Sequence, residues 1–129
     1  MRIAVVGLGR MGRFYAHTIA SRGADSQLAA VADPDPVARI AVKAEFGVPF
    51  VTADPTEIFA RPEIDAVVIA TPTSTHAELV VAAAQAGKAI FCEKPLALSL
   101  EQTHAALAAV QRAGVLLQVG FMRRFDPAY

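Results

Sequence analysis

Three glycines near the start of the chain have the spacing of a turn that binds the phosphates of a dinucleotide. Residues 1–12 read MRIAVVGLGRMG, so a short apolar run leads directly into Gly7, Gly9 and Gly12. In such a turn the first glycine permits a tight bend, the second lets the backbone approach a pyrophosphate, and the third lets helix and strand pack closely. The alternative is a tight turn that binds no ligand, and the expected strand before it and helix after it argue against that interpretation.

The helix expected from Arg10 would present its N-terminus to the phosphates. Free N–H groups and the positive end of the helix dipole stabilise negative charge there. The residues predicted to contact the cofactor in this turn are Gly7, Leu8, Gly9, Arg10, Met11 and Gly12.

Asp33 stands where the adenosine ribose of such a dinucleotide would lie. It ends the apolar run LAAVAD, 21 positions after Gly12. A carboxylate there accepts hydrogen bonds from the ribose hydroxyls and repels a 2′-phosphate. Asp35 adds a second negative charge and no basic residue follows before Arg39, so NAD is favoured over NADP. Alternatively, Asp33 opens a turn with Pro34 or caps a helix that begins near Pro36.

The composition indicates one compact domain, residues 1–129, and excludes several classes of partner. The chain has 12 basic and 12 acidic residues, which argues against nucleic acid or an anionic membrane as the main partner. No apolar run approaches the ~20 residues that span a bilayer, and the N-terminus does not have the pattern of a signal peptide. The single cysteine, Cys92, cannot form an internal disulfide, which favours a reducing cytoplasm. No metal site is predicted.

Short apolar runs alternate with helical patterns along the whole chain, which is typical of βαβ units. The fold class is therefore α/β, a doubly wound parallel sheet of about six strands with helices on both faces. Strands are expected at Arg2–Val6, Gln27–Ala32, Phe50–Val51, Asp65–Ala70, Ala89–Cys92 and Val115–Val119. Helices are expected at Arg10–Arg22, Pro36–Phe46, Pro55–Phe59, Thr75–Ala86 and Leu100–Ala113.

A polar loop, ATPTSTH, follows the strand expected at residues 65–70. Ligands of doubly wound sheets lie at the carboxyl ends of the strands, so Thr71, Pro72, Thr73 and His76 are predicted to face the cofactor. Ser74 or Thr75 could instead cap the next helix, with Glu78 completing a capping box. The alternative for His76 is a structural role near the start of that helix.

The next strand ends in a second polar segment, Phe91-Cys92-Glu93-Lys94-Pro95. An apolar strand that ends in two opposite charges forms either a solvated turn or a catalytic pair. Together, GLGRMG, ATPTSTH, FCEKPLA and QVGFMRRFDPAY resemble the glucose–fructose oxidoreductase / inositol dehydrogenase (Gfo/Idh/MocA) family, across the whole chain and most closely its inositol 2-dehydrogenase branch. The resemblance implies the N-terminal Rossmann domain of an NAD-dependent sugar or polyol oxidoreductase.

The resemblance also implies roles for individual residues. Lys94 would be catalytic, contacting the substrate hydroxyl and the nicotinamide ribose, while Glu93 would adjoin the cofactor and set the orientation or charge of Lys94. An ammonium beside the reacting oxygen stabilises developing alkoxide charge. Arg123 and Arg124 would lie on the substrate side, a solvated basic turn being the alternative. The Lys94–Pro95 bond could be cis, although most X–Pro bonds are trans.

Members of the family continue into a second domain that completes the substrate pocket. Residues 1–129 are therefore expected to bind NAD(H), to meet a polyol or sugar only in a full-length context, to turn it over poorly, and to form a homodimer. Two other functions remain open: a stand-alone NAD-binding module or sensor, and an adenosylmethionine-binding domain.

Overall fold

The computed structural model describes residues 1–128, except for the side chains of Arg123 and Phe125. Within them, six parallel strands form one sheet in the order β3-β2-β1-β4-β5-β6. The strands are β1 (Arg2–Val6), β2 (Gln27–Ala32), β3 (Phe50–Thr52), β4 (Ala66–Ile69), β5 (Ala89–Glu93) and β6 (Leu117–Gly120). The order reverses at β1, which pairs with both β2 and β4, so the predicted doubly wound sheet is confirmed.

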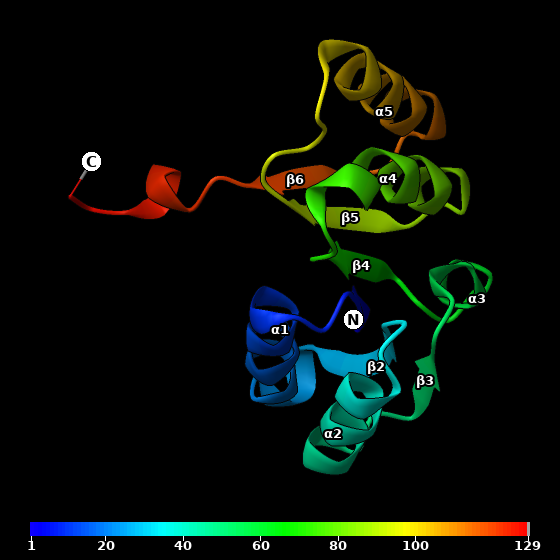
Figure 1. The fold of residues 1–129 in the computed structure, drawn as a ribbon, viewed down its shortest axis with the longest axis vertical. Coiled ribbons are helices and arrows are strands. Elements are labelled where there is room, and N and C mark those ends of the chain that lie inside the picture. The colour runs from blue at the N-terminus through cyan, green and yellow to red at the C-terminus, as the bar shows by residue number, and fades with distance from the viewer. Residues whose placement is uncertain (129) are drawn as a thin grey trace.

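Helices cover both faces of the sheet (Figure 1). They are α1 (Arg10–Ala20), α2 (Pro36–Phe46), α3 (Pro55–Phe59), α4 (His76–Gln85) and α5 (Leu100–Ala113), with three 3-10 turns, η1 (Gly23–Asp25), η2 (Thr73–Thr75) and η3 (Met122–Phe125). The C-terminal segment that contains η3 extends away from the sheet (Figure 1).

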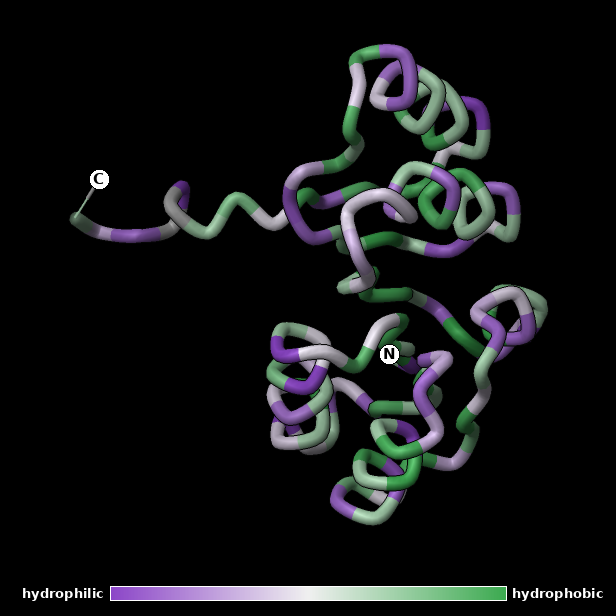
Figure 2. The backbone as a smooth tube through the Cα atoms, viewed as in Figure 1, coloured by the Kyte–Doolittle hydropathy of each residue, from purple (hydrophilic) through white to green (hydrophobic). Residues whose placement is uncertain are grey.

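Strand side chains alternate between two hydrophobic cores. Val5 and Val68 pack with α1 and α2 on one face, whereas Val6, Val67 and their neighbours pack with α3, α4 and α5 on the other. Successive residues of a strand point to opposite faces, so a strand that is apolar at every position needs a core on each side. The hydropathy-coloured tube shows this in β4 and β5, which are largely green (Figure 2).

The predicted helices at residues 36–46, 55–59 and 100–113 are confirmed to the residue. Most other boundaries differ by one or two residues; α1, for example, ends at Ala20 and not at the predicted Arg22. The last strand begins at Leu117 instead of Val115, because the Val115 N–H still bonds the Val110 carbonyl in the final turn of α5. Helix α4 begins at His76 because residues 73–75 form a separate 3-10 turn.

Three helices have side-chain caps and two do not. Asp35, Asp54 and Ser99 accept hydrogen bonds from the first turns of α2, α3 and α5. No side chain caps α1 or α4. The predicted capping box at Thr75 and Glu78 is therefore wrong, because the Thr75 hydroxyl is engaged with the loop before the helix.

At the end of the sheet opposite the carboxyl ends of the strands, a buried lysine ties two connections together. Lys88 is 4% exposed, and its Nζ donates to the carbonyl oxygens of Arg61 (2.6 Å) and Ile64 (2.9 Å). Burial lowers the pKa of Lys88, and the nearby carboxylates of Glu63 and Asp65 partly offset this. Lys88 thus stabilises the segment between α3 and β4.

Candidate cofactor site

The three glycines of the N-terminal turn are required for three different reasons. Gly7 has φ +93°, and a Cβ there would lie 2.6 Å from the Ala70 carbonyl oxygen. A Cβ on Gly12 would lie 1.7 Å from the Gly7 carbonyl oxygen, so the helix could not pack against the turn. A Cβ on Gly9 meets nothing within 4 Å. Gly7 and Gly12 therefore serve the fold, whereas Gly9 borders open space that a ligand can fill.

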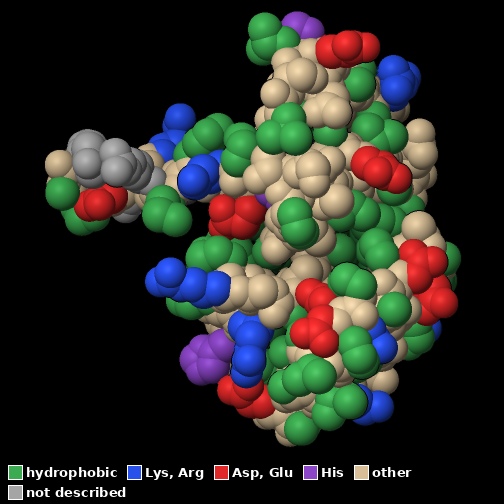
Figure 3. Space-filling model, in the orientation of Figure 1, with side chains coloured by type: hydrophobic (Ala, Val, Ile, Leu, Met, Phe, Trp, Pro, Cys, Tyr) green, Lys and Arg blue, Asp and Glu red, His purple; other side chains and the backbone are tan. Residues whose placement is uncertain are grey.

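That open space lies at the N-terminus of α1. Gly9 is the N-cap of this helix, no side chain caps it, and its first turn contains no acidic residue. The first N–H groups of a helix need partners, and phosphate oxygens are suitable ones. The turn therefore fits the pyrophosphate of a dinucleotide. Figure 3 shows Lys and Arg side chains on the side of the molecule from which the C-terminal segment extends, near this turn.

Asp33 connects the glycine turn to the end of β2. Its Oδ2 accepts a hydrogen bond from the Leu8 N–H (2.7 Å), and its Oδ1 accepts one from the Asp35 N–H (2.8 Å). Asp35, and not Asp33, caps α2 through the Val37 N–H (2.9 Å). Each carboxylate oxygen retains a second lone pair, so Asp33 can still accept hydrogen bonds from ribose hydroxyls.

Arg39 fixes the loop that carries Asp33. Its guanidinium donates to the carbonyl oxygens of Asp33 (2.7 Å) and Pro34 (3.0 Å). The first basic residue after Asp33 thus folds back onto the loop backbone. Sequence reasoning identified this residue only as a distant charge.

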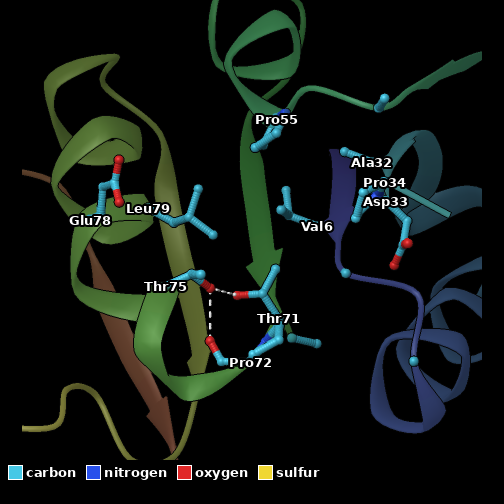
Figure 4. Close-up of a pocket in the computed structure, with 14 residues that line it drawn as sticks. Val6, Ala32, Asp33, Pro34, Pro55, Thr71, Pro72, Thr75, Glu78 and Leu79 are labelled. Carbon is cyan, nitrogen blue, oxygen red and sulfur yellow. Dashed lines mark hydrogen bonds between the residues drawn. The ribbon is translucent and has the colours of Figure 1, made fainter.

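A cavity of about 730 Å³ extends from the glycine turn past Asp33. Figure 4 shows Asp33 and Pro34 on one side of it and Leu79 and Glu78 of α4 on the other. Val6, Ala32, Ala53, Pro55 and Ala70 add apolar surface. A mostly apolar cavity with a few polar groups at its edge is typical of a small-molecule site.

The Thr71 loop forms the floor of this cavity. The Thr75 hydroxyl lies 2.7 Å from both Thr71 Oγ1 and the Pro72 carbonyl oxygen (Figure 4). These contacts hold the loop in a compact turn before α4. Thr71 and Pro72 line the large cavity, and Thr71 and Thr73 line a second one.

The second cavity, of about 310 Å³, lies at the carboxyl ends of β4 and β5. It brings together residues that the sequence predicted separately. Its lining consists of Met11, Ala70, Thr71, Thr73, His76, Glu93, Lys94 and Met122. It lies on the β4 side of the glycine turn, whereas Asp33 lies on the β2 side.

Glu93 is held in this cavity by two donors. The Tyr15 hydroxyl donates to Oε1, and the Lys94 backbone N–H donates to Oε2 (3.2 Å). Tyr15 lies on α1 and packs edge-to-face against Phe91 and Phe14. Burial raises the pKa of Tyr15, and the hydrogen bond to Glu93 and the charge of Glu93 raise it further. Tyr15 therefore remains a donor to the carboxylate over the physiological range.

His76 joins the two loops that border the second cavity. It is 1% exposed, and its Nδ1 and Nε2 each lie 2.8 Å from a carbonyl oxygen, that of Pro95 and that of Thr71 respectively. His76 therefore has the structural role that was one of the two alternatives, namely bridging the Thr71 and Pro95 loops. A contact between His76 and the cofactor stays a prediction. The Lys94–Pro95 peptide bond is cis.

The remaining predicted residues are placed as follows. Leu8 has its side chain in the core, so only its backbone faces the turn, and Arg10 is exposed at the start of α1. Lys94 is exposed at the rim of the second cavity. Arg124 is exposed in η3, and the prediction for the side chain of Arg123 lies outside the described residues.

Cys92, beside Glu93, is buried and unreactive. Burial, and to a lesser degree the charge of Glu93, raises its pKa to about 12. The described residues contain no group of three or more side chains that could hold a metal ion. None of the described helices is long and apolar enough to cross a membrane.

The sheet order, the glycine turn and the carboxylate after β2 together define an NAD-binding Rossmann domain. Residues 1–121 match the model of the Gfo/Idh/MocA oxidoreductase family, described as having an NAD-binding Rossmann fold. The chain belongs to this family, and the predicted resemblance and cofactor are confirmed.

Curated relatives and solved structures agree with this assignment. The chain is 48% identical over 129 residues to scyllo-inositol 2-dehydrogenase (NAD(+)) of Bacillus subtilis and 46% identical over 129 residues to inositol 2-dehydrogenase of Rhizobium meliloti. Each match covers 100% of this chain and 38% of the relative, so the chain spans about two fifths of the relatives' length. The scyllo-inositol dehydrogenase of Lactobacillus casei with bound NAD(H) and scyllo-inositol superimposes with a TM-score of 0.94 at 35% identity, over 100% of this chain and 38% of that one.

Proposed function

We propose that this chain provides the cofactor half of a dehydrogenase that oxidises a cyclic polyol or a sugar with NAD. The observation that carries the proposal is the pairing of the two cavities on either side of one glycine turn. The names of the relatives, which are inositol and scyllo-inositol dehydrogenases, suggest the cyclic polyol as the substrate class.

The proposed roles follow from the geometry. The large cavity would hold the adenosine, with Asp33 at the ribose, and the N-terminus of α1 would hold the pyrophosphate. The second cavity, with Thr71, Thr73, Glu93 and Lys94, would hold the nicotinamide half. When bound, NAD accepts a hydride from a carbon that carries a hydroxyl group.

Lys94 is the proposed catalytic residue of the chain. Its ammonium group stands at the rim of the second cavity, where a substrate hydroxyl could approach it. A fixed positive charge beside that oxygen stabilises the alkoxide that develops as the hydroxyl loses its proton. Arg123 and Arg124 are proposed to contact the polyol, since guanidinium groups are strong donors to hydroxyl oxygens.

Binding and turnover are tested separately. Calorimetry with NAD, NADP and adenosylmethionine on residues 1–129 should show binding of NAD, weaker binding of NADP and none of adenosylmethionine. Binding of adenosylmethionine alone would contradict the proposal. The comparison also separates a dinucleotide domain from a methyl-donor domain, which shares a glycine-rich turn and an acid after the second strand.

Turnover is followed by NADH formation with myo-inositol, scyllo-inositol and several aldoses. We propose that residues 1–129 alone oxidise these substrates near or below detection. They cover 38% of each relative, and the resemblance implies that a second domain completes the substrate pocket. Acid–base groups of such a pocket typically contribute about 10²–10⁴-fold to a rate. In a protein that turns over, Lys94→Ala should abolish the rate while leaving NAD affinity nearly unchanged. An unaffected rate would exclude the catalytic role of Lys94.

A homodimer and a cytoplasmic location are proposed on narrower grounds. Phe14, Phe121 and Met122 are exposed, and a symmetric pair of chains would bury such surface. Light scattering at micromolar concentration tests the pairing. The buried free thiol of Cys92 fits a reducing compartment, which fractionation of the source cells would test.

A further inference from the structure

Glu93 differs from the other charged groups of the site because it is buried. The residue is 9% exposed, whereas Lys94 at the rim of the same cavity is exposed. Both of its hydrogen-bond partners among the described residues, the Tyr15 hydroxyl and the Lys94 backbone N–H, are neutral donors. Among the described side chains, the salt bridges are Arg13–Glu45 and Arg61–Glu63, and neither involves Glu93. Its negative charge is therefore held in the cavity by hydrogen bonds to neutral groups.

The position of this charge relative to the cofactor rests on the proposed function. With the ribose at Asp33 and the pyrophosphate at Gly9, a dinucleotide continues toward the carboxyl ends of β4 and β5. Glu93 is the last residue of β5 and lines the cavity there. The carboxylate therefore belongs to the nicotinamide half of the site, remote from the adenosine.

The two redox forms of the cofactor differ in charge only at that end. The nicotinamide ring of NAD⁺ carries a formal positive charge, and that of NADH is neutral, while the adenosine, ribose and phosphate groups are identical. A carboxylate near the ring attracts the oxidised form and has little effect on the reduced form. Burial strengthens this attraction, since fewer water molecules screen the charge.

We propose that Glu93 determines the preference of the site for the oxidation state of its cofactor, favouring NAD⁺ over NADH through its negative charge. The ammonium of Lys94 opposes this effect, but its exposure to solvent weakens its field. The consequence is a site that loads the oxidised cofactor and releases the reduced one, which suits oxidation of an alcohol. Tyr15 acts as a positioning residue, because its hydroxyl holds the carboxylate in the cavity.

The test compares two dissociation constants, for NAD⁺ and for NADH, in the unmodified chain and in Glu93→Gln. Glutamine has the same shape, and it can accept from the Lys94 N–H through its oxygen and donate to the Tyr15 hydroxyl through its amide. The ratio Kd(NAD⁺)/Kd(NADH) should rise on the order of tenfold, as expected for one charge in a partly enclosed site. Glu93→Asp, which keeps the charge, should bring the ratio back toward that of the unmodified chain.

Glu78→Gln is the matched control. Glu78 lines the adenosine cavity, so the same loss of charge there should change both dissociation constants by the same factor. A purely structural role of Glu93 would also weaken both forms equally. An unchanged ratio in Glu93→Gln, or a ratio that changes as much in Glu78→Gln, overturns the inference.

A second variant covers the case in which Glu93→Gln does not fold, which thermal melting would show. Tyr15→Phe/Glu93→Met replaces the hydroxyl and the carboxylate by apolar groups, an exchange that is often nearly neutral for stability, and leaves the N–H of the exposed Lys94 to water. It should give the same rise in the ratio. If the unmodified chain binds neither NAD⁺ nor NADH, the proposed function itself fails. If it binds both and the ratio is insensitive to Glu93, only the present inference is overturned.

Discussion

The two halves of the cleft are built in different ways. On the β2 side, the polar part of the site is mainly backbone joined by one carboxylate: Asp33 accepts hydrogen bonds from the N–H groups of Leu8 and Asp35, all within the first third of the chain. On the β5 side, it depends on side chains that come from distant elements. Tyr15 reaches Glu93 across 78 positions, and His76 reaches Pro95 across 19.

This difference explains why a short sequence pattern can predict the glycine turn but not the contacts around Glu93. A backbone site needs particular residues at fixed spacing, because only glycine permits the required turn and the close packing. A side-chain site needs only that suitable groups meet after folding, and many sequences can meet that requirement. Substitutions should therefore affect the glycine turn severely and the Glu93 side more gradually.

The largest effect is expected within the glycine turn, where two alanine substitutions should separate folding from binding. In Gly12→Ala the added Cβ would meet the Gly7 carbonyl oxygen at 1.7 Å, so α1 must move off the turn. The free energy of unfolding should fall by about 3 kcal/mol or more, the upper end of the cost of overpacking, because the contact is with rigid backbone. Denaturant titration measures this loss.

Gly9→Ala is the matched comparison. Its Cβ meets no protein atom within 4 Å, so stability should change by less than about 1 kcal/mol. The methyl group would occupy the space proposed for the pyrophosphate, and NAD affinity should fall at least about tenfold, which calorimetry would detect. Normal NAD affinity in Gly9→Ala would contradict the placement of the pyrophosphate.

The fold was predictable because each element has a local signal. The alternation of apolar runs and helical patterns predicted all six strands and the starts of α2, α3 and α5. In the structure these helices follow the capping residues Asp35, Asp54 and Ser99. The glycine spacing and the acid at position 33 predicted the cofactor. These signals all act over a few residues or a single βαβ unit.

The contacts that join distant elements were not predictable in the same way. Tyr15 is an ordinary aromatic residue of a helix until folding places Glu93 beside it, and Arg39 is an ordinary helix residue until its guanidinium turns back onto residues 33 and 34. The capping box at Thr75 failed for a local reason, since the Thr75 hydroxyl is hydrogen-bonded to Thr71 and to the Pro72 carbonyl oxygen of the preceding loop. No pattern in the sequence distinguishes these partners from others at similar distance.

The second largest effect should arise far from both halves of the cleft, at Lys88. Lys88→Met removes the donor from one buried and one partly buried carbonyl oxygen, and it should lower the free energy of unfolding by about 2 to 4 kcal/mol. NAD affinity should not change, because Lys88 lies at the opposite end of the sheet. Lys43→Met, at an exposed position of α2, is the control and should change stability by less than about 0.5 kcal/mol.

The Lys88 contribution should also depend on pH. Burial lowers the pKa of Lys88 below its usual value of 10.5, so the unfolded chain binds this proton more tightly than the folded one. The stability difference between the unmodified chain and Lys88→Met should therefore grow as the pH rises toward 10.5. A difference that shrinks over that range would contradict the assignment.

A smaller effect is expected at Asp33, and it concerns specificity. Asp33→Ser removes the charge that should repel a 2′-phosphate but keeps a hydrogen-bonding group at the ribose. The preference for NAD over NADP should narrow by about 1 to 2 kcal/mol, as a like-charge conflict in a partly exposed site predicts. Titration of the unmodified chain with both cofactors is the reference. An equal affinity for both cofactors before any substitution would show that Asp33 does not face the ribose.

An effect no larger than this should come from Tyr15→Phe, which sharpens the comparison between the two halves of the cleft. The ring keeps its packing against Phe14 and Phe91, and only the hydrogen bond to Glu93 is lost. Stability should fall by about 1 to 2 kcal/mol, as for a hydrogen bond to a charged group.

The contribution of the Tyr15 hydroxyl should also depend on pH. Because burial and Glu93 raise the pKa of Tyr15 above its usual 10.0, the folded state holds this proton more tightly than the unfolded one. The stabilisation from the hydroxyl should be constant below pH 10 and decline as the pH rises above it. Denaturant titrations of both proteins at several pH values measure this difference, and a constant difference across pH 10 would show that the hydroxyl is not bonded to the carboxylate.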